Sequence, residues 1–208
     1  MLQYITNNKS SVPVAEQVKK VIAGGCRWIQ IATKGLSDDQ IREITSEILP
    51  QCLEVQAFLI MESKVELAKE LNVGGVFLEE GDMPCSQARM LLGPAAVIGV
   101  GASSMADVLK VSALDIDYYA LLPFALRDED EGKALGLEGI KEIISEMEKQ
   151  EVNIPHVAAV GIKYEDVQAL VAAGVNGIAV SDAIAFAPDI TAETEKFIKA
   201  LPEPESAD

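Results

Sequence analysis

The sequence from His156 to Ile184 constrains the fold more than any other stretch of this chain. An apolar run over His156–Gly161 is followed by apolar residues at helical spacing over Tyr164–Ala173, and then by a second apolar run over Gly177–Ser181. Gly174 stands just past the expected helix, where glycine is favoured. Two apolar strands joined by one helix predict a parallel, right-handed βαβ unit whose strands are buried on both faces.

The rest of the chain repeats this alternation of strand and helix. Six further strands are expected over Leu2–Thr6, Trp28–Thr33, Val55–Met61, Gly75–Leu78, Val97–Gly101 and Tyr118–Phe124. Seven further helices are expected over Pro13–Ile22, Ser37–Leu49, Lys64–Leu71, Pro84–Leu92, from a cap at Ser103 or Ser104 to Leu114, Leu137–Lys149 and Thr191–Leu201. Eight such units in 208 residues predict an α/β fold, a single-domain (β/α)8 TIM barrel over residues 1–201. Residues 202–208, PEPESAD, are expected to form a disordered tail.

Composition and charge narrow the classes of partner. Hydrophobic residues make up 49% of the chain and aromatic residues only 5%, which predicts an aliphatic core. The formal net charge of −16 argues against nucleic acid as a partner, because binding it usually needs a basic face. A phosphorylated small molecule stays possible, since backbone amides and a metal ion can supply local positive potential.

The expected location is the cytoplasm. No apolar run approaches the roughly 20 residues of a membrane span, and the first residues lack the basic and apolar regions of a signal peptide. Cys26, Cys52 and Cys85 are spaced unlike any metal motif, and we expect free thiols in a reducing compartment.

Several segments, taken in order, resemble one known family. The resemblance runs from Leu2 to Ile184, and its most specific pieces are GGCRWIQIATKGLS, LAKELNVGGVFLEEGDMP, LLGPAAVIGVGASS, IDYYALLP and PHVAAVGI…AAGVNGIAVSDAI. The chain is similar to the thiamine phosphate synthase family, which includes thiazole tautomerase relatives. The resemblance implies a transferase that condenses hydroxymethylpyrimidine diphosphate with thiazole phosphate, gives thiamine phosphate and releases pyrophosphate, with Mg2+ on the diphosphate.

The family's site residues transfer to this sequence one at a time. Its second-strand motif, Gln-Leu-Arg-x-Lys, leaves Gln30 and Lys34 as substrate-binding candidates, although a structural hydrogen bond would equally explain a buried Gln30. Glu62 and Asp82, at the ends of the third and fourth strands, are the implied magnesium ligands, since two carboxylates suit a hard cation that keeps its waters.

The resemblance also implies substrate contacts beyond the last two strands. Gly161 and Ser181 are the candidates there, at the end of the barrel where phosphate is often held. The neighbouring Asp182 is expected to be a helix N-cap. No catalytic residue can be named from the sequence.

Other family positions differ in this chain, which makes it a divergent member. Gly101 stands in place of a serine after the fifth strand, and Arg127–Glu131 replaces a Thr-x-Thr-Lys loop that grips the diphosphate. Arg127 and Lys133 are the remaining cations of that loop. Two alternatives to the synthase therefore stay open: a retasked relative that binds a small ligand without turnover, and an interaction protein that uses the barrel as a scaffold. A homo-oligomer is possible, but the sequence shows no interface patch.

Overall fold

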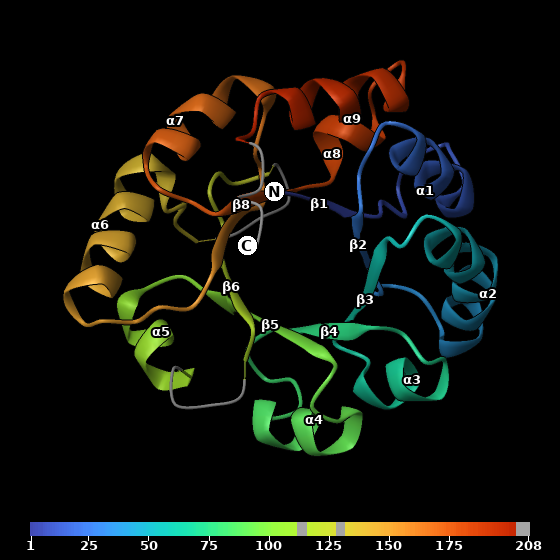
Figure 1. The fold of residues 1–208 in the computed structure, drawn as a ribbon, viewed down its shortest axis with the longest axis horizontal. Helices are drawn as coiled ribbons and strands as arrows, with labels where there is room; N and C mark the ends of the chain where they lie inside the picture. The colour runs from blue at the N-terminus through green and yellow to red at the C-terminus, as the bar shows by residue number, and fades with distance from the viewer. Residues whose placement is uncertain (112–115, 128–131, 203–208) are drawn as a thin grey trace.

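Eight parallel strands close into a barrel in the order in which they occur in the chain (Figure 1). The computed structural model describes residues 1–111, 116–127 and 132–202. The strands are β1 (Leu2–Ile5), β2 (Trp28–Ile31), β3 (Phe58–Glu62), β4 (Gly75–Leu78), β5 (Val97–Ala102), β6 (Tyr118–Leu121), β7 (His156–Ala159) and β8 (Gly177–Val180). The seam joins β1 to β8, with Gln3 opposite Ala179. The predicted (β/α)8 barrel is confirmed.

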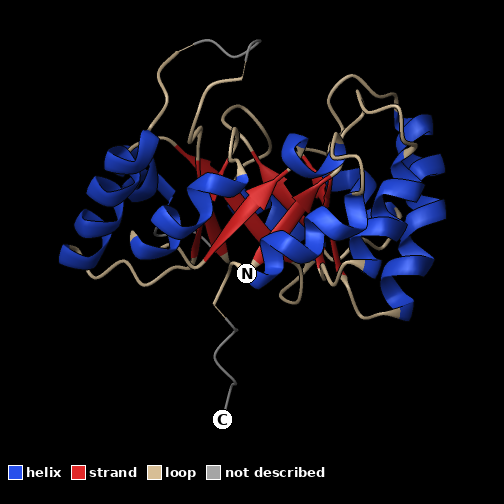
Figure 2. Cartoon of the chain, turned by 90° about the horizontal axis from the view of Figure 1, so that it is seen from above, coloured by secondary structure: helices blue, strands red, loops and turns tan. Residues whose placement is uncertain are grey.

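Helices surround the strands, and the strand arrows point to one common end of the barrel (Figure 2). The helices are α1 (Val14–Ala23), α2 (Asp38–Glu54), α3 (Val65–Glu70), α4 (Cys85–Leu92), α5 (Met105–Val111), α6 (Gly136–Lys149), α7 (Val167–Ala172), α8 (Asp182–Ala185) and α9 (Ile190–Lys199), and a 3-10 turn (Tyr164–Asp166) precedes α7. Of the described helices, none is both long and apolar enough to cross a membrane.

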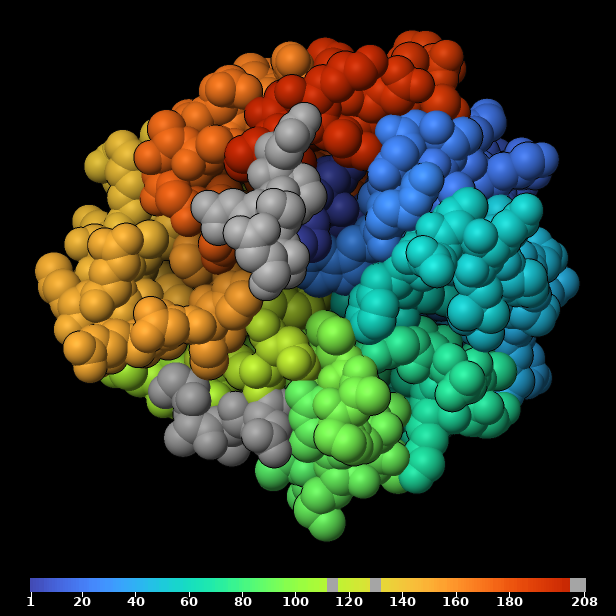
Figure 3. All heavy atoms as spheres, in the orientation of Figure 1, coloured from blue at the N-terminus to red at the C-terminus, as the bar shows by residue number. Residues whose placement is uncertain are grey.

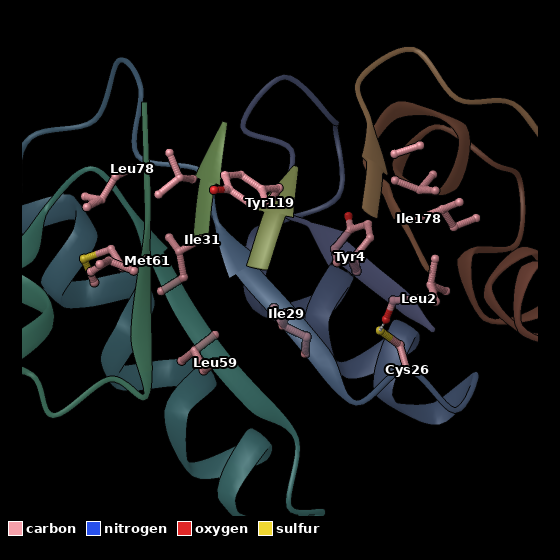
Figure 4. Packing of buried hydrophobic residues seen from close by; sticks show 14 of the residues in the cluster. Leu2, Tyr4, Cys26, Ile29, Ile31, Leu59, Met61, Leu78, Tyr119 and Ile178 are labelled. Carbon is pink, nitrogen blue, oxygen red and sulfur yellow. Dashed lines mark hydrogen bonds between the residues drawn. The ribbon is translucent and has the colours of Figure 1, made fainter. Parts of the chain in front are cut away.

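Alternate residues along the strands point to opposite sides of the barrel wall and pack into two separate hydrophobic cores, one under the helices and one inside the barrel. Outward-facing side chains such as Tyr4, Ile29 and Met61 pack under the helices (Figure 4). Inward-facing side chains fill the barrel and form a second buried cluster: Ile60, Phe77, Tyr118, Ala120, Val157, Ala159 and Ala179. Both cores are mainly aliphatic, as the composition predicts.

Two predicted boundaries around α2 were wrong. The helix was expected to end at Leu49 and the next strand to begin at Val55, but α2 continues through Pro50 to Glu54 and β3 begins at Phe58. The buried face of α2 runs through Ile48 to Cys52, so packing of the last turn on the barrel outweighs the loss of one backbone donor at an exposed proline.

The structure tests the helix N-caps that were predicted for α5 and α8. Ser104 caps α5, because its Oγ accepts a hydrogen bond from the Asp107 amide at 3.2 Å. The predicted end of that helix, Leu114, and all of the predicted tail beyond Pro202 lie outside the described residues. The N-cap expected at Asp182 was wrong: Ser181 occupies the N-cap position, and Asp182 is the first helical residue of α8.

Replacing Ser37 by alanine is expected to lower the free energy of unfolding by about 1 kcal/mol. Ser37 and Gln40 form a capping box at the start of α2, in which each side chain accepts a hydrogen bond from the other residue's amide. Urea unfolding would measure the loss. Ser46→Ala, in the exposed middle of the same helix, is the control and should change stability much less.

Candidate active site

Gln30 lies inside the barrel, where Gln3 on β1 holds its side chain and links it to Tyr118 on β6. Its side chain is 2% exposed. The Gln3 amide nitrogen donates to Gln30 Oε1 at 3.1 Å and to the Tyr118 hydroxyl at 3.1 Å. Burial raises the pKa of Tyr118, so its hydroxyl stays protonated at neutral pH. The carbonyl end of Gln30 is therefore used within the protein, and its amide nitrogen is the end left to donate to a ligand.

Glu62 ties the loop after β2 to the end of β3. Its Oε2 accepts hydrogen bonds from the backbone amides of Thr33 at 3.0 Å and Lys34 at 3.4 Å. The Thr33 hydroxyl donates in turn to the Glu62 carbonyl oxygen at 3.0 Å. The hydrogen bond to Glu62 fixes the backbone of Lys34. The Lys34 side chain is exposed at the rim, where its ammonium group can reach a ligand.

Asp82 makes a matching connection between the ends of β3 and β4. Its Oδ2 accepts from the Ser63 hydroxyl at 2.6 Å and from the Glu79 amide at 2.8 Å. Ser63 has a φ of 57°, which turns the chain sharply just past Glu62. The two carboxylates predicted as a pair thus lie on adjacent strand ends, each held through one oxygen.

Glu79 is the rim residue that the sequence analysis did not select. Partial burial raises the pKa of its carboxyl above the usual range, and the charges of Glu62 and Asp82 raise it further. Lys34 and Arg127 lower the same pKa. These five charged groups therefore share one region of the barrel mouth. Its position directly after β4 was the available signal, since strand ends in such barrels carry functional groups.

Gly161 and Ser181 lie at the mouth beyond β7 and β8 but serve the fold as well. Gly161 has a φ of 76°, and a Cβ there would overlap the carbonyl oxygen of Ala125 in the neighbouring loop. The Asn7 amide nitrogen donates to Ser181 Oγ at 3.2 Å and to Asp182 Oδ1 at 2.6 Å. Their proposed contact with substrate stays a prediction, because these contacts already explain both residues.

The residues at the mouth fit magnesium as donors, but they do not form a complete site. Glu62 and Asp82 offer hard carboxylate oxygens, and Mg2+ is commonly held by one or two carboxylates together with water and substrate phosphate. Over the described ranges, no three His, Cys, Asp or Glu side chains group closely enough to hold a metal ion. The rest of the coordination would have to come from water and the substrate.

The family model described as "Thiamine monophosphate synthase" matches residues 2–184 of this chain. The chain belongs to the thiamine monophosphate synthase family. The thiamine-phosphate synthase of Bacteroides fragilis is 38% identical over 199 residues, which are 95% of this chain and 98% of that protein. The thiamine-phosphate synthase of Pyrococcus abyssi is 30% identical over 201 residues, which are 96% and 94% of the two chains.

A solved structure from the family has the same fold as this family member. Thiamine phosphate pyrophosphorylase from Pyrococcus furiosus matches with a TM-score of 0.85 at 28% sequence identity, over 96% of this chain and 94% of its own. The predicted family resemblance is confirmed. The acids Asp128–Glu131, which the resemblance aligns with the family's diphosphate loop, lie outside the described residues. Of that loop, the structure describes Arg127 and Lys133, both exposed.

Replacing Glu79 by glutamine is expected to raise the free energy of unfolding at pH 7 by about 0.5 kcal/mol or less, since the carboxyl is only partly buried and solvent screens its interactions. A carboxyl whose pKa is raised by folding destabilises the native state only where it is ionised. The gain should therefore be present at pH 7 and disappear as the pH falls through the raised pKa and below the usual glutamate range.

Thermal unfolding of both proteins across that pH range would measure the difference. Glu66→Gln, on the exposed side of α3, is the control and should give no gain that depends on pH in this way. An equal gain for Glu79→Gln at low and neutral pH would contradict the shared acidic mouth.

Proposed function

We propose that this chain is a thiamine-phosphate synthase that acts at the mouth of the barrel. In the proposed reaction, hydroxymethylpyrimidine diphosphate loses pyrophosphate as the bond between its methylene carbon and the diphosphate oxygen breaks. The thiazole nitrogen then bonds to that carbon, giving thiamine phosphate. The observation that carries the proposal is 38% identity to a thiamine-phosphate synthase over 95% of the chain.

The described residues support a division of tasks at the mouth. Gln30 has its carbonyl end fixed by Gln3, and its amide nitrogen is available to orient the pyrimidine substrate. Lys34 and Arg127 are the cations near the acidic strand ends and would contact the diphosphate. Positioning and charge stabilisation are the protein's contribution to such a dissociative substitution.

Glu62 and Asp82 would hold magnesium in this proposal. Each has one oxygen engaged by the protein, so the carboxylates are already oriented before a metal binds. When bound, Mg2+ supplies positive charge to the departing diphosphate. Gly161 and Ser181 would contact the phosphate of the thiazole substrate, at the end of the barrel where phosphate is commonly held.

A second candidate is a relative that binds one of these ligands without turnover. The observation that favours it is the exchange of a cationic loop for Asp128–Glu131, together with Gly101 in place of a serine. Charge-assisted hydrogen bonds are worth roughly 1.5–3 kcal/mol each. Losing three of them would cost on the order of 10³-fold or more in binding or rate.

Calorimetry followed by a pyrophosphate-release assay separates these functions. The full chain is titrated with thiazole phosphate and with the pyrimidine diphosphate, each with and without Mg2+. Binding of both substrates and magnesium-dependent release of pyrophosphate supports the synthase. Binding of one ligand without release supports the second candidate. Absence of heat from either ligand contradicts both and leaves the barrel as a scaffold for a protein partner.

A further inference from the structure

Three polar side chains inside the barrel form one hydrogen-bonded unit. Gln3 on β1 is 1% exposed, and its amide nitrogen donates to Gln30 Oε1 on β2 and to the Tyr118 hydroxyl on β6, at 3.1 Å each. Figure 3 shows the dark blue atoms of the start of the chain near the centre of the molecule, with later segments around them. An amide nitrogen carries two hydrogens, so both donors of Gln3 are engaged within the barrel.

The strand register places Gln3 below Gln30 and the mouth above it. Gln30 lies level with Ile5 on β1, so Gln3 is one inward-facing position nearer the N-terminal ends of the strands. Gln30 also lies level with Ile60 on β3, so Glu62 is one inward-facing position nearer the mouth. The Gln30 carbonyl oxygen is thus held from below. Among the described residues, none accepts a hydrogen bond from its amide nitrogen, which is the end available to a ligand at the mouth.

The two ends of an amide make opposite demands on a ligand. A nitrogen that faces the ligand needs a hydrogen-bond acceptor there, whereas an oxygen needs a donor. Half a turn about the last side-chain bond of Gln30 would exchange these two ends, and both orientations are ordinary rotamers. Gln3 opposes that turn, because it would set the amide nitrogens of Gln30 and Gln3 against each other and leave buried donors unpaired.

We propose that Gln3 is a positioning residue that makes the mouth select a ring with a hydrogen-bond acceptor opposite Gln30. The inference rests on the proposed synthase function, because it concerns how the same mouth recognises the pyrimidine substrate. A ring nitrogen of that substrate carries a lone pair and can accept from Gln30 Nε2. A ring with C–H at that point leaves the buried donor without a partner, and sites built to hydrogen-bond a ligand discriminate strongly against such analogues.

Calorimetry with two analogues of the pyrimidine diphosphate tests the selection. Each analogue has one of the two ring nitrogens replaced by C–H, and thiazole phosphate is left out so that binding is measured without turnover. The parent should bind one of the two analogues at least about 10-fold more weakly than the natural diphosphate. Gln3→Met removes both donated hydrogen bonds at nearly constant volume and should bring these affinities to within about 3-fold of each other.

A double-mutant cycle shows whether Gln3 acts through Gln30. Gln30→Met removes the donor itself and should abolish the discrimination between natural diphosphate and analogue. Adding Gln3→Met to Gln30→Met should then cause no further loss of affinity, whereas a merely structural role of Gln3 would lower the affinity equally in both backgrounds. Gln17→Met is the matched control, since Gln17 is a fully buried glutamine of α1 that accepts from Tyr4 outside the barrel. This control should lower stability and keep the parent's discrimination.

The outcomes separate this inference from the proposed function. A parent that discriminates between the ligands but releases no pyrophosphate would contradict the synthase and support the role of Gln3. A parent that releases pyrophosphate but binds both analogues as well as the natural diphosphate would overturn the role of Gln3 alone. Unchanged discrimination in Gln3→Met, or additive losses in the cycle, would overturn it as well. A parent that does not bind the diphosphate would overturn both.

Discussion

Replacing Glu62 by glutamine is expected to slow magnesium-dependent pyrophosphate release by at least about 100-fold. The glutamine carbonyl oxygen can still accept the hydrogen bond that Thr33 donates to Glu62, so the loop after β2 should keep its place. What is lost is the negative charge proposed to hold magnesium. Steady-state release of pyrophosphate at increasing Mg2+ would measure the effect, and a higher magnesium requirement is expected beside the lower rate.

A second substitution and a control separate this role from a structural one. Glu62→Ala removes the side-chain acceptor of the Thr33 and Lys34 amides as well as the charge, so only this variant should lower the midpoint of thermal unfolding. Asp39→Asn makes the same change of charge on α2, where the side chain is 97% exposed, and should leave the rate unchanged. A Glu62→Gln protein that keeps more than about a tenth of the parent rate would show that the carboxylate only fixes the loop.

Replacing Gly99 by alanine is expected to lower the free energy of unfolding by about 3 kcal/mol. Gly99 lies on β5 inside the barrel, where a Cβ would overlap the ring and hydroxyl of Tyr118 on the neighbouring strand. That ring also packs edge-on against Trp28, at 4.8 Å between centroids, and cannot move freely aside. For a chain of this size the loss corresponds to a fall of about 10 °C in the unfolding midpoint.

The next inward-facing position of the same strand provides the control. A Cβ at Gly101 would have its nearest neighbour at 3.5 Å, so Gly101→Ala should be nearly neutral. Adding Tyr118→Leu to Gly99→Ala removes the overlapping atoms and should recover part of the lost stability, giving a measurable coupling energy. Additive losses from the two substitutions would contradict the overlap.

The fold could be predicted because its signals are local. Each strand is a short apolar run and most of the helices between them carry a 3.6-residue pattern, so the alternation alone predicts the parallel barrel. The errors fall where packing overrides local preference. The helix was expected to end at Leu49, but burial of Cys52 extends α2 past Pro50 to Glu54. Asp182 is a favoured N-cap residue, but Asn7 from the other side of the seam engages it as the first residue of α8.

The site could be predicted only in part, because its contacts join distant segments. The order of strand ends placed Glu62 and Asp82 side by side, but it could not show that backbone amides and Ser63 already hold one oxygen of each. The role of Gln3 beside Gln30 depends on the barrel interior, where residues 27 positions apart meet. Glu79 could have been selected from its position directly after β4. It was missed because the family motif emphasises Asp82. The functions assigned to these side chains stay predictions until the assays are done.

The seam between β1 and β8 has a consequence for how this protein is made. Translation delivers β1 before the other strands of the barrel, but its second partner, Gly177–Val180, leaves the ribosome only after all of the others. At about 5–20 residues per second, the edge of β1 stays unpaired for on the order of ten seconds. Such an edge is a template for pairing with other chains. Changes that weaken β8 should therefore lower the yield of the newly made protein more than they lower the stability of the finished barrel.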